Sequence, residues 1–396
     1  MDLSRRIIIA GVDYTQASQP FSYRTNAGGL NSTAAATSLE DTESSDLQNI
    51  DFDVLGSFRK RGGTTLLNTT AFNSSATWNG LYWFEKSNGN KYLMGVCGSK
   101  FGEATSLTQA ATPFTDRTGG ITLTAGNNNQ VSWATMLDIV VGTNGVDVPF
   151  QAAGAGNATA LTVPTGLTTA KYTEVFSNYC LLANVTVSGV YYGSRVYWSN
   201  IDSLTTWTAS DFRDVSKADG QVITGMRTLG SSLVIFKRRS IWIANFTGDS
   251  DIPFVFQKTR SSVGCVSGSS VQEVENGLVF MADDGKYYFD GNNSYKISDR
   301  VLTTLLSFNQ SRFANVPSIY YFTKNRYISS FTLNGHSTND RCLTWDSKNN
   351  AFSLYVPNYD ADGDFVAGIT ANCFARVYNA GVEEIYYGDY SGFVHK

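Results

Sequence analysis

The sequence predicts an all-β protein, a β-propeller of about six to eight blades with an irregular N-terminal arm or platform. From Gly63 onward, short runs of alternating apolar and polar residues are separated by Asn-Gly, Asp-Gly and Gly-Asn turn signals, a pattern typical of antiparallel hairpins. These hairpins recur about every 40 to 55 residues, the spacing expected when four-stranded blades repeat around a central axis. We therefore divide the chain into an N-terminal arm or platform, residues 1–62, and a β-propeller, residues 63–396.

The arm differs from the rest of the chain in composition. Residues 15–49 contain few large aliphatic side chains and many Ser, Thr, Asn and Gly residues, which favours irregular structure. Within this segment we expect one short helical turn at residues 38–47. Ser38 or Asp41 could cap that turn, and its acidic residues would lie near the positive end of the helix dipole.

The propeller region contains seven segments that each predict one hairpin: residues 80–98, 138–151, 178–200, 231–246, 277–291, 325–346 and 383–395. Three stretches repeat one phrase, an apolar strand, a tight polar turn and a second strand that carries aromatic residues. They are residues 140–151, 280–291 and 386–396. Such an echo indicates one structural unit used repeatedly. A β-sandwich is the alternative fold.

Composition and charge limit the classes of function. A formal net charge of −4 excludes a protein that wraps nucleic acid over its whole surface, since that requires a dominant field of Lys and Arg. The five cysteines are scattered, odd in number and without a CxxC pair, so we expect reduced core thiols of a protein made in a cytoplasm. No apolar run approaches the roughly 20 residues that cross a bilayer, and no export signal is evident, so we expect a soluble protein without lipid membrane binding.

Catalytic motifs are missing from the sequence. The two histidines, His336 in a predicted surface loop and His395 in a predicted frayed tail, neighbour no Ser, Cys or Asp arrangement of the triad type. No glycine-rich phosphate loop occurs. We therefore predict a protein that is not an enzyme and has no cofactor. A glycosidase remains a third alternative, because its two carboxylates have no fixed spacing in sequence.

One acidic cluster has ligand-like chemistry. Asp360, Asp362 and Asp364 stand at alternate positions with Gly363 between them, which resembles the first half of a calcium loop. The twelfth position of such a loop is Ala371 rather than a bidentate Glu, so an EF-hand is excluded. These three aspartates are a weak metal candidate, and a solvated hairpin tip is the preferred interpretation.

Two basic triplets are the notable cationic features, Arg59-Lys60-Arg61 and Lys237-Arg238-Arg239. If both lie in strands, alternate side chains project to opposite faces, so that the outer two residues of each triplet lie together and the middle one points away. We consider all six as candidates for subunit-interface or DNA-channel contacts. The alternative interpretation is that these residues are solvated cations that protect strand edges from pairing with other strands.

Two stretches of this chain resemble the bacteriophage short-tail proteins of the nozzle, tail tubular protein B and packaged-DNA stabilisation group. Residues 28–63 run from a Gly-Gly-Leu-Asn phrase through an acidic stretch to a basic strand, and match the group's pattern at Asn49, Asp51, Phe52, Gly56, Arg59, Lys60, Arg61 and Gly63. Gly62 replaces the usual proline. Residues 231–291 resemble the group's middle region, with Phe-Lys-Arg, Ser-Ile-Trp, Gly-Cys-Val-Ser and Asp-Asp-Gly phrases. Together the two stretches cover about a quarter of the chain.

The resemblance implies a β-propeller with an added platform that forms a ring, usually a hexamer, below the portal and adaptor of a phage tail. Such a ring retains packaged DNA, holds DNA transiently in its channel and passes it at ejection. Its expected partners are copies of itself, the adaptor and portal proteins, and tail fibre or spike proteins. Its expected location is the virion tail, after assembly in the bacterial cytoplasm. Residues 49–63 would then mark the entry of the arm into the first blade, with Phe52 and Phe58 as core anchors.

The runner-up function is a carbohydrate-binding or host-receptor-binding β-propeller of a virion. Six tryptophans could stack on a sugar ring: Trp83, Trp133, Trp198, Trp207, Trp242 and Trp345. Burial in a blade is the alternative interpretation of each. A cluster of solvent-facing Trp and Tyr on one face of the propeller would favour recognition of a receptor.

Overall fold

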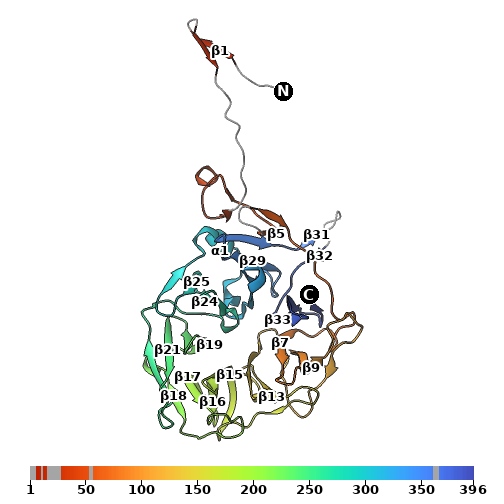
Figure 1. Ribbon diagram of the computed structural model, residues 1–396, viewed down its shortest axis with the longest axis vertical. Coiled ribbons are helices and arrows are strands. Elements are labelled where there is room, and N and C mark those ends of the chain that lie inside the picture. The colour runs from red at the N-terminus through yellow and green to blue at the C-terminus, as the bar shows by residue number, and fades with distance from the viewer. Residues whose placement is uncertain (1–5, 10–11, 16–27, 53–56, 360–364) are drawn as a thin grey trace.

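The computed structural model describes residues 6–9, 12–15, 28–52, 57–359 and 365–396. Seven antiparallel sheets stand around a central axis and form a seven-bladed β-propeller (Figure 1). Six blades have four strands each, and the sheet of the seventh has three named strands. The prediction of an all-β propeller is therefore confirmed, and seven blades lie within the predicted range.

Each blade runs from its innermost strand outward in chain order. The first three blades are β7 (Trp78–Glu85), β8 (Lys91–Cys97), β9 (Lys100–Ala104) and β10 (Thr115–Asp116); β11 (Ser132–Met136), β12 (Ile139–Thr143), β13 (Phe150–Ala152) and β14 (Thr159–Ala160); and β15 (Leu167–Phe176), β16 (Tyr179–Val187), β17 (Val190–Trp198) and β18 (Phe212–Asp214). The next three are β19 (Ile223–Leu229), β20 (Ser232–Lys237), β21 (Ser240–Phe246) and β22 (Phe254–Lys258); β23 (Gln272–Val274), β24 (Gly277–Ala282), β25 (Gly285–Phe289) and β26 (Ser294–Lys296); and β27 (Ser318–Tyr321), β28 (Arg326–Phe331), β29 (Arg341–Asp346) and β30 (Ala351–Tyr355).

Helical segments are short and lie between strands. Within the described residues they are the α-helix α1 (Leu302–Leu306) and the 3-10 turns η1 (Ala36–Ser38), η2 (Lys217–Asp219), η3 (Gly268–Ser270), η4 (Asp299–Val301), η5 (Gln310–Asn315) and η6 (Phe322–Lys324).

The seventh blade combines three strands near the C-terminus with a segment that precedes the first blade. It contains β33 (Cys373–Asn379), β34 (Val382–Gly388) and β35 (Val394–His395). Residues 65–67 lie antiparallel beside β35, with a bridge between Leu66 and His395 and a hydrogen bond of 2.8 Å from the Leu67 N–H to the Val394 carbonyl. This segment acts as the fourth strand, and the innermost strand β33 packs against β7 of the first blade. The ring of blades is thus closed by residues from both ends of the chain, and the edge of β35 is covered.

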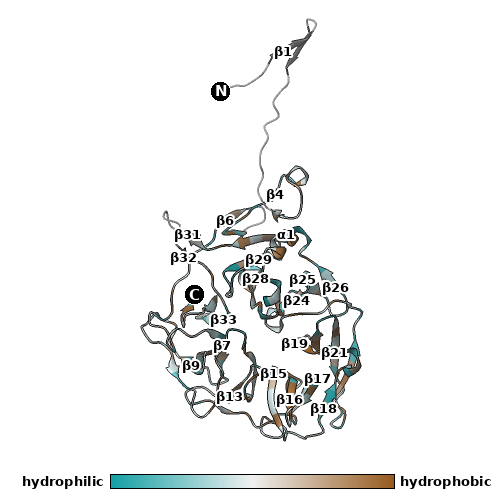
Figure 2. Ribbon diagram, turned by 180° about the vertical axis from the view of Figure 1, so that it is seen from behind, coloured by the Kyte–Doolittle hydropathy of each residue, from teal (hydrophilic) through white to brown (hydrophobic). Residues whose placement is uncertain are grey.

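The hydrophobic core is divided among the blades. Seven clusters of buried apolar side chains lie one between each pair of neighbouring blades, with the last between blades seven and one. Figure 2 shows the hydrophobic residues along blade strands such as β16 and β19. Because each sheet packs on both faces, the strands carry few charges, which agrees with the 16% of charged residues in the sequence.

The repeated phrase of the sequence corresponds to one position in the blade. The three stretches form the second and third strands of the second, fifth and seventh blades, namely β12–β13, β24–β25 and β34–β35. The interpretation of the phrase as one reused unit is confirmed. The innermost strands begin at Trp78, Ser132, Leu167, Ile223, Gln272, Ser318 and Cys373, so their spacing varies from 35 to 56 residues.

The arm pairs with the outer edge of the sixth blade. It contains the short strands β3 (Gly29–Leu30), β4 (Glu43–Ser44), β5 (Ile50–Phe52) and β6 (Phe58–Lys60). Gln48 pairs in parallel with Leu354 of β30, and the backbones of Asn49 and Leu47 exchange hydrogen bonds with Leu354 at 2.8 and 3.0 Å. The arm therefore adds a strand to blade six and covers that sheet edge.

Two predictions for the arm are wrong. The helical turn expected at residues 38–47 is absent, because that backbone pairs with residues 28–31 as β4 beside β3. Phe52 is a core anchor, at 4% exposed, whereas Phe58 is 43% exposed. The reason is position: β5 packs against β30, and β6 pairs on the other side of β5.

Two small hairpins complete the described chain. They are β1 (Arg6–Ile9) with β2 (Val12–Thr15), and β31 (Asn358–Tyr359) with β32 (Phe365–Ala367).

Candidate functional site

The central channel of the propeller forms a cavity in the described part of the chain. Its volume is about 280 Å³, and residues from the inner strands of all seven blades line it. Since ligand pockets are concave and favour places where several elements converge, this channel is the first candidate for a binding site.

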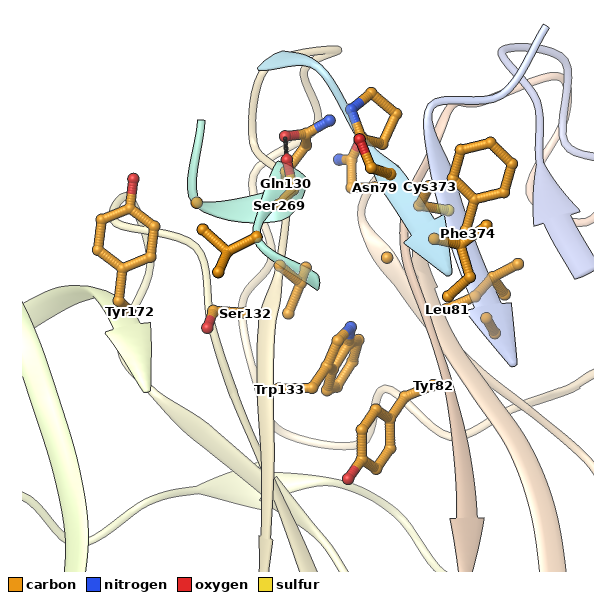
Figure 3. Close-up of a pocket in the computed structure, with 18 of the residues that line it drawn as sticks. Asn79, Leu81, Tyr82, Gln130, Ser132, Trp133, Tyr172, Ser269, Cys373 and Phe374 are labelled. Atoms are coloured by element: carbon orange, nitrogen blue, oxygen red, sulfur yellow. Dashed lines mark hydrogen bonds between the residues drawn. The ribbon is translucent and has the colours of Figure 1, made fainter. Parts of the chain in front are cut away.

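A glutamine closes one mouth of the channel. Gln130, just before β11, donates from its amide nitrogen to the Asn315 and Asn372 carbonyls at 3.2 and 3.1 Å, and its amide oxygen accepts from Ser269 Oγ at 2.8 Å. Figure 3 shows the contact between Gln130 and Ser269. Gln130 of the second blade thereby joins the fifth, sixth and seventh blades across the mouth.

Two aromatic side chains form the wall deeper in the channel. Tyr82 and Trp133 come from the first two blades and stack with their ring centroids 5.8 Å apart (Figure 3). The Tyr82 hydroxyl pairs with Thr135 Oγ1 at 2.8 Å, and burial raises the pKa of Tyr82. Gly80 is required behind this pair, because a Cβ there would lie 2.8 Å from Trp133 Nε1.

A carboxyl group with a raised pKa lies in the same part of the channel. Glu174 of β15 is half-buried and surrounded by the inner strands, and this burial raises its pKa from 4.5 to about 7. The charge of Arg227 and a long hydrogen bond of 3.5 Å from Thr228 Oγ1 oppose that shift. Near neutral pH, Glu174 is thus a mixture of the neutral acid and the carboxylate.

Three cations also line the channel, namely Lys171, Arg227 and Arg376. Arg376 is partnered: its Nε lies 3.1 Å from Glu383 Oε1 and its NH2 donates to the Tyr320 carbonyl at 2.6 Å. Arg227 and Lys171 form no ion pair with any residue in the described part of the chain. Burial lowers the pKa of Lys171 and of Arg376, and the nearby charge of Arg227 adds to the effect on Arg376.

Among the channel residues, sequence reasoning named Trp83 and Trp133, as candidates for stacking on a sugar, and missed the charged ones. The channel residues come from seven separate segments, and no spacing within one segment brings them together. One signal existed, since β15 reads LTTAKYTEVF and places Lys171 and Glu174 within an otherwise uncharged strand. A charge in an inner strand of a propeller faces the channel or the gap between blades, so such positions can be searched for once the fold is known.

The first basic triplet lies on the arm. Arg59 and Lys60 are exposed residues of β6. Arg61 follows β6, donates from Nε to Asn49 Oδ1 at 3.3 Å, and lies over the Tyr355 ring at 5.1 Å from its centroid. Arg61 therefore helps to hold the arm on blade six.

The second triplet differs from the prediction. Lys237 ends β20, is fully buried, and pairs with Asp219 at 2.9 Å, so it cannot contact DNA or another subunit from this position. Arg238 and Arg239 form the two-residue turn before β21, so the expected alternation of faces is also wrong. Arg238 pairs with Asp283 of the next blade at 2.7 Å, and both turn arginines are exposed. The Lys-Arg-Arg run is split because a hairpin turn falls inside it.

The other titratable candidates are placed as follows. Asp360, Asp362 and Asp364 lie outside the described residues. His336 is in an exposed loop beside Asp340, with 2.8 Å between Nδ1 and Oδ2. His395 is not in a frayed tail, since it belongs to β35 and stacks on Tyr387 with ring centroids 4.6 Å apart. The described residues contain no group of three or more His, Cys, Asp or Glu side chains that could hold a metal ion.

Cysteines and tryptophans occupy the interior. All five cysteines are free and buried, as predicted, and burial raises the pKa of Cys97, Cys180, Cys265 and Cys342 to about 12. Trp198 and Trp345 are buried, Trp207 and Trp242 are half-buried, and Trp83 and Trp133 line the channel. Within the described ranges, no helix is long and apolar enough to cross a membrane.

Comparisons with known proteins show no family for this chain. No family model and no curated protein matches the chain. Among solved structures, the WD40 β-propeller domain of Doa1 is 8% identical, with 84% of this chain and 96% of that chain covered and a TM-score of 0.47. A chain of the mitotic checkpoint complex is 8% identical, with 84% of this chain and 92% of that chain covered and a TM-score of 0.47. The computationally designed Ika8 protein is 12% identical, with 83% of this chain and 98% of that chain covered and a TM-score of 0.42. The strand order of its seven sheets shows that the chain is a β-propeller. The solved structures add no family and no function to that finding.

Proposed function

We propose that this propeller is a structural subunit of a short bacteriophage tail. In this proposal, copies of the chain form a ring, a nozzle below the portal and adaptor, that retains packaged DNA and passes it at ejection. The ring is a hexamer, as in the phage group that the sequence resembles, and its other partners are tail fibre or spike proteins. The subunit is located in the virion and is not an enzyme.

The support is that the two stretches that resemble phage nozzle proteins fold together. Leu30, Leu47 and Phe52 of the first stretch share one hydrophobic core with Val279 and Met281 of the second. The core lies between blades five and six, where the arm is also paired with β30. Segments more than 200 residues apart in the chain thus meet in one core, where the arm packs on the propeller. This contact supports the proposal, because the resemblance implies a propeller with an added platform.

The charges of the arm suit an interface in this ring. Arg59 and Lys60 project from β6 at the outside of the platform, and Phe58 beside them is an exposed aromatic residue. Aromatic and Arg side chains are enriched at the centres of protein interfaces. We therefore place a subunit contact at β6, and we keep Arg59, Lys60 and Arg61 as the interface candidates together with the turn residues Arg238 and Arg239.

The path of DNA in this proposal is the axis between subunits. The propeller's own channel has a volume of about 280 Å³ and is crossed by Gln130, so a duplex cannot thread through a single subunit. The weakly acidic chain would limit adhesion of DNA to the lumen, since like charges disfavour phosphate contacts.

Ring symmetry is the test of this function. Native mass spectrometry and particle imaging of the purified chain, alone and with a portal–adaptor complex, are expected to show a closed ring in at least one condition. The double variant Phe58→Ser/Lys60→Glu should reduce ring formation, whereas the control Asp202→Asn, at an exposed turn of blade three, should not. A monomer that ignores the adaptor, or turnover of a glycan or nucleic acid by the purified protein, would contradict the proposal.

The runner-up function, recognition of a carbohydrate or host receptor by a virion propeller, is favoured by one observation. The tryptophans that line the central channel are Trp83 and Trp133, which also pack against the cores between blades seven and one and between blades one and two. Exposed tyrosines are instead spread over different blades, at Tyr191, Tyr295 and Tyr378. A receptor function would therefore use the channel rather than an aromatic surface.

A further inference from the structure

The wall of the central channel contains a half-buried guanidinium, that of Arg227. Arg227 extends from β19 into the channel wall and forms no ion pair with any described residue. Its charge acts on Glu174, on Tyr82 and on a second guanidinium, that of Arg376. A guanidinium held inside a protein without a counter-charge is costly, which favours the entry of an anion.

The charges that face Glu174 decide the net charge of this region. They are Arg227 on β19, Tyr82 on β7, Glu273 on β23 and Lys171 on Glu174's own strand, with Thr228 as a hydrogen-bond donor. Arg376 is already balanced by Glu383. Lys171 and Glu273 are both exposed overall, and Glu273 does not line the channel. When Glu174 is neutral, Arg227 is therefore the half-buried charge of the channel wall that has no ion pair with a described residue.

The polar groups of the wall that a ligand can reach are few. Glu174 and the Tyr82 hydroxyl belong to residues that line the channel and are only half-buried. Asn79 Nδ2, Asn372 Oδ1 and Trp133 Nε1 lack a hydrogen-bond partner among the described residues, but these atoms are covered by protein and present no surface to the channel. Hydroxyl contacts of a ligand therefore fall to Glu174 and Tyr82.

Size and closure limit what can enter. The volume of about 280 Å³ lies just below the range of about 300–1,000 Å³ of typical ligand pockets, so one ring-sized molecule fits better than a chain. Gln130 blocks one mouth through its contacts to three other blades, so a polymer cannot thread through the channel. The stacked pair Tyr82 and Trp133 supplies an aromatic wall of the kind that sugar rings contact.

We propose that the central channel binds one acidic monosaccharide, a sugar of the hexuronate class, whose carboxylate pairs with Arg227 and whose hydroxyls meet Glu174 and Tyr82. Arg227 suits this role because its fork can hold a carboxylate through two parallel hydrogen bonds. This site does not depend on the proposed tail ring, since every group that forms it belongs to one chain.

The test is isothermal titration calorimetry of the full chain with D-glucuronate, D-glucose and inorganic phosphate. Glucuronate is expected to bind saturably and at least tenfold more tightly than glucose, which has the same ring without the carboxylate. Phosphate should bind more weakly than glucuronate, because it offers charge without the hydroxyl-rich ring. No saturable binding of glucuronate, equal binding of glucose, or phosphate as the tighter ligand would each overturn the proposal.

Variants assign the binding to Arg227. Arg227→Met should lower glucuronate affinity at least tenfold, and Arg227→Lys, which keeps the charge but loses the fork, should lower it several-fold. Arg239→Met, an exposed arginine in the β20–β21 turn, is the matched control and should leave affinity unchanged. If Arg227→Met does not fold, the Lys variant carries the test. Affinity that is unchanged in the folded Arg227 variants would place the ligand elsewhere and refute the site.

The pH profile separates this site from a merely structural Arg227. Affinity for glucuronate should fall as pH rises through about 7, because Glu174 then becomes a carboxylate that repels the ligand. Glu174→Gln should remove that decline and keep the affinity at its low-pH value. A decline that persists in Glu174→Gln would contradict the placement of the ligand beside Glu174.

Discussion

Replacement of Asp51 by alanine is expected to lower the free energy of unfolding by about 3–5 kcal/mol. Arg326 is buried, with its side chain 7% exposed, and its NH1 lies 3.0 Å from Asp51 Oδ1. Asp51 also accepts a hydrogen bond from the Tyr355 hydroxyl. Removal of the carboxylate leaves a buried guanidinium with its carbonyl contact to Phe52 but without this counter-charge. Urea unfolding followed by tryptophan fluorescence measures the change.

The control for this prediction is Asp41→Ala, at an exposed position on the same arm, which should change stability by less than about 0.5 kcal/mol. Limited proteolysis adds a second readout, since weakened docking of the arm should speed cleavage between residues 28 and 62. If Asp51→Ala costs under about 1 kcal/mol and leaves proteolysis unchanged, the Asp51–Arg326 pair does not hold the arm on blade six.

Replacement of Glu174 by glutamine is expected to raise the free energy of unfolding by about 3 kcal/mol at pH 8 and by little at pH 4. The folded-state pKa of about 7 lies above the ordinary value of 4.5, so between these values the folded state binds more protons than the unfolded state. Stability of the wild type therefore falls as pH rises from about 4.5 through 7. Glutamine cannot ionise, so the variant escapes this loss.

The check is to measure the free energy of unfolding of the Glu174→Gln variant and of the wild type at pH 4, 6 and 8. The difference between the two proteins is compared across pH, because the titration of all other groups cancels in that difference. The matched control is Glu40→Gln, an exposed carboxyl on the arm, which should give the same small difference at every pH. A Glu174→Gln difference that stays constant from pH 4 to pH 8 would mean that the folded and unfolded states protonate Glu174 equally, and would contradict the raised pKa.

The sequence was most informative where structure is local. Hairpins such as residues 80–98 and 277–291 were predicted because strand alternation and turn residues lie within one short window. The fold class followed from their repetition. Blade number was only bracketed, because the spacing of inner strands varies with loop length rather than with the blade itself.

Sequence reasoning failed where distant segments meet. The pairing of Leu66 with His395 and of Gln48 with Leu354 depends on edges that exist only after the blades have formed. Lys237 was considered an exposed cation because its partner Asp219 lies on a separate 3-10 turn. For the same reason these channel residues were missed: Tyr82, Glu174 and Arg227 become neighbours only through the circular arrangement of the blades.

The closure of the seventh blade sets an order for folding during synthesis. Asn68 accepts a hydrogen bond from the Val394 N–H, 326 residues later in the chain, so the early strand must wait for nearly all of the described chain to be made. Blades one to six can form in sequence behind the ribosome, since each consists of consecutive strands. Residues 65–67 meanwhile present an unpaired edge that could engage a neighbouring nascent chain. Slow translation of the final blade would prolong this exposed period, and fast synthesis of β33–β35 would shorten it.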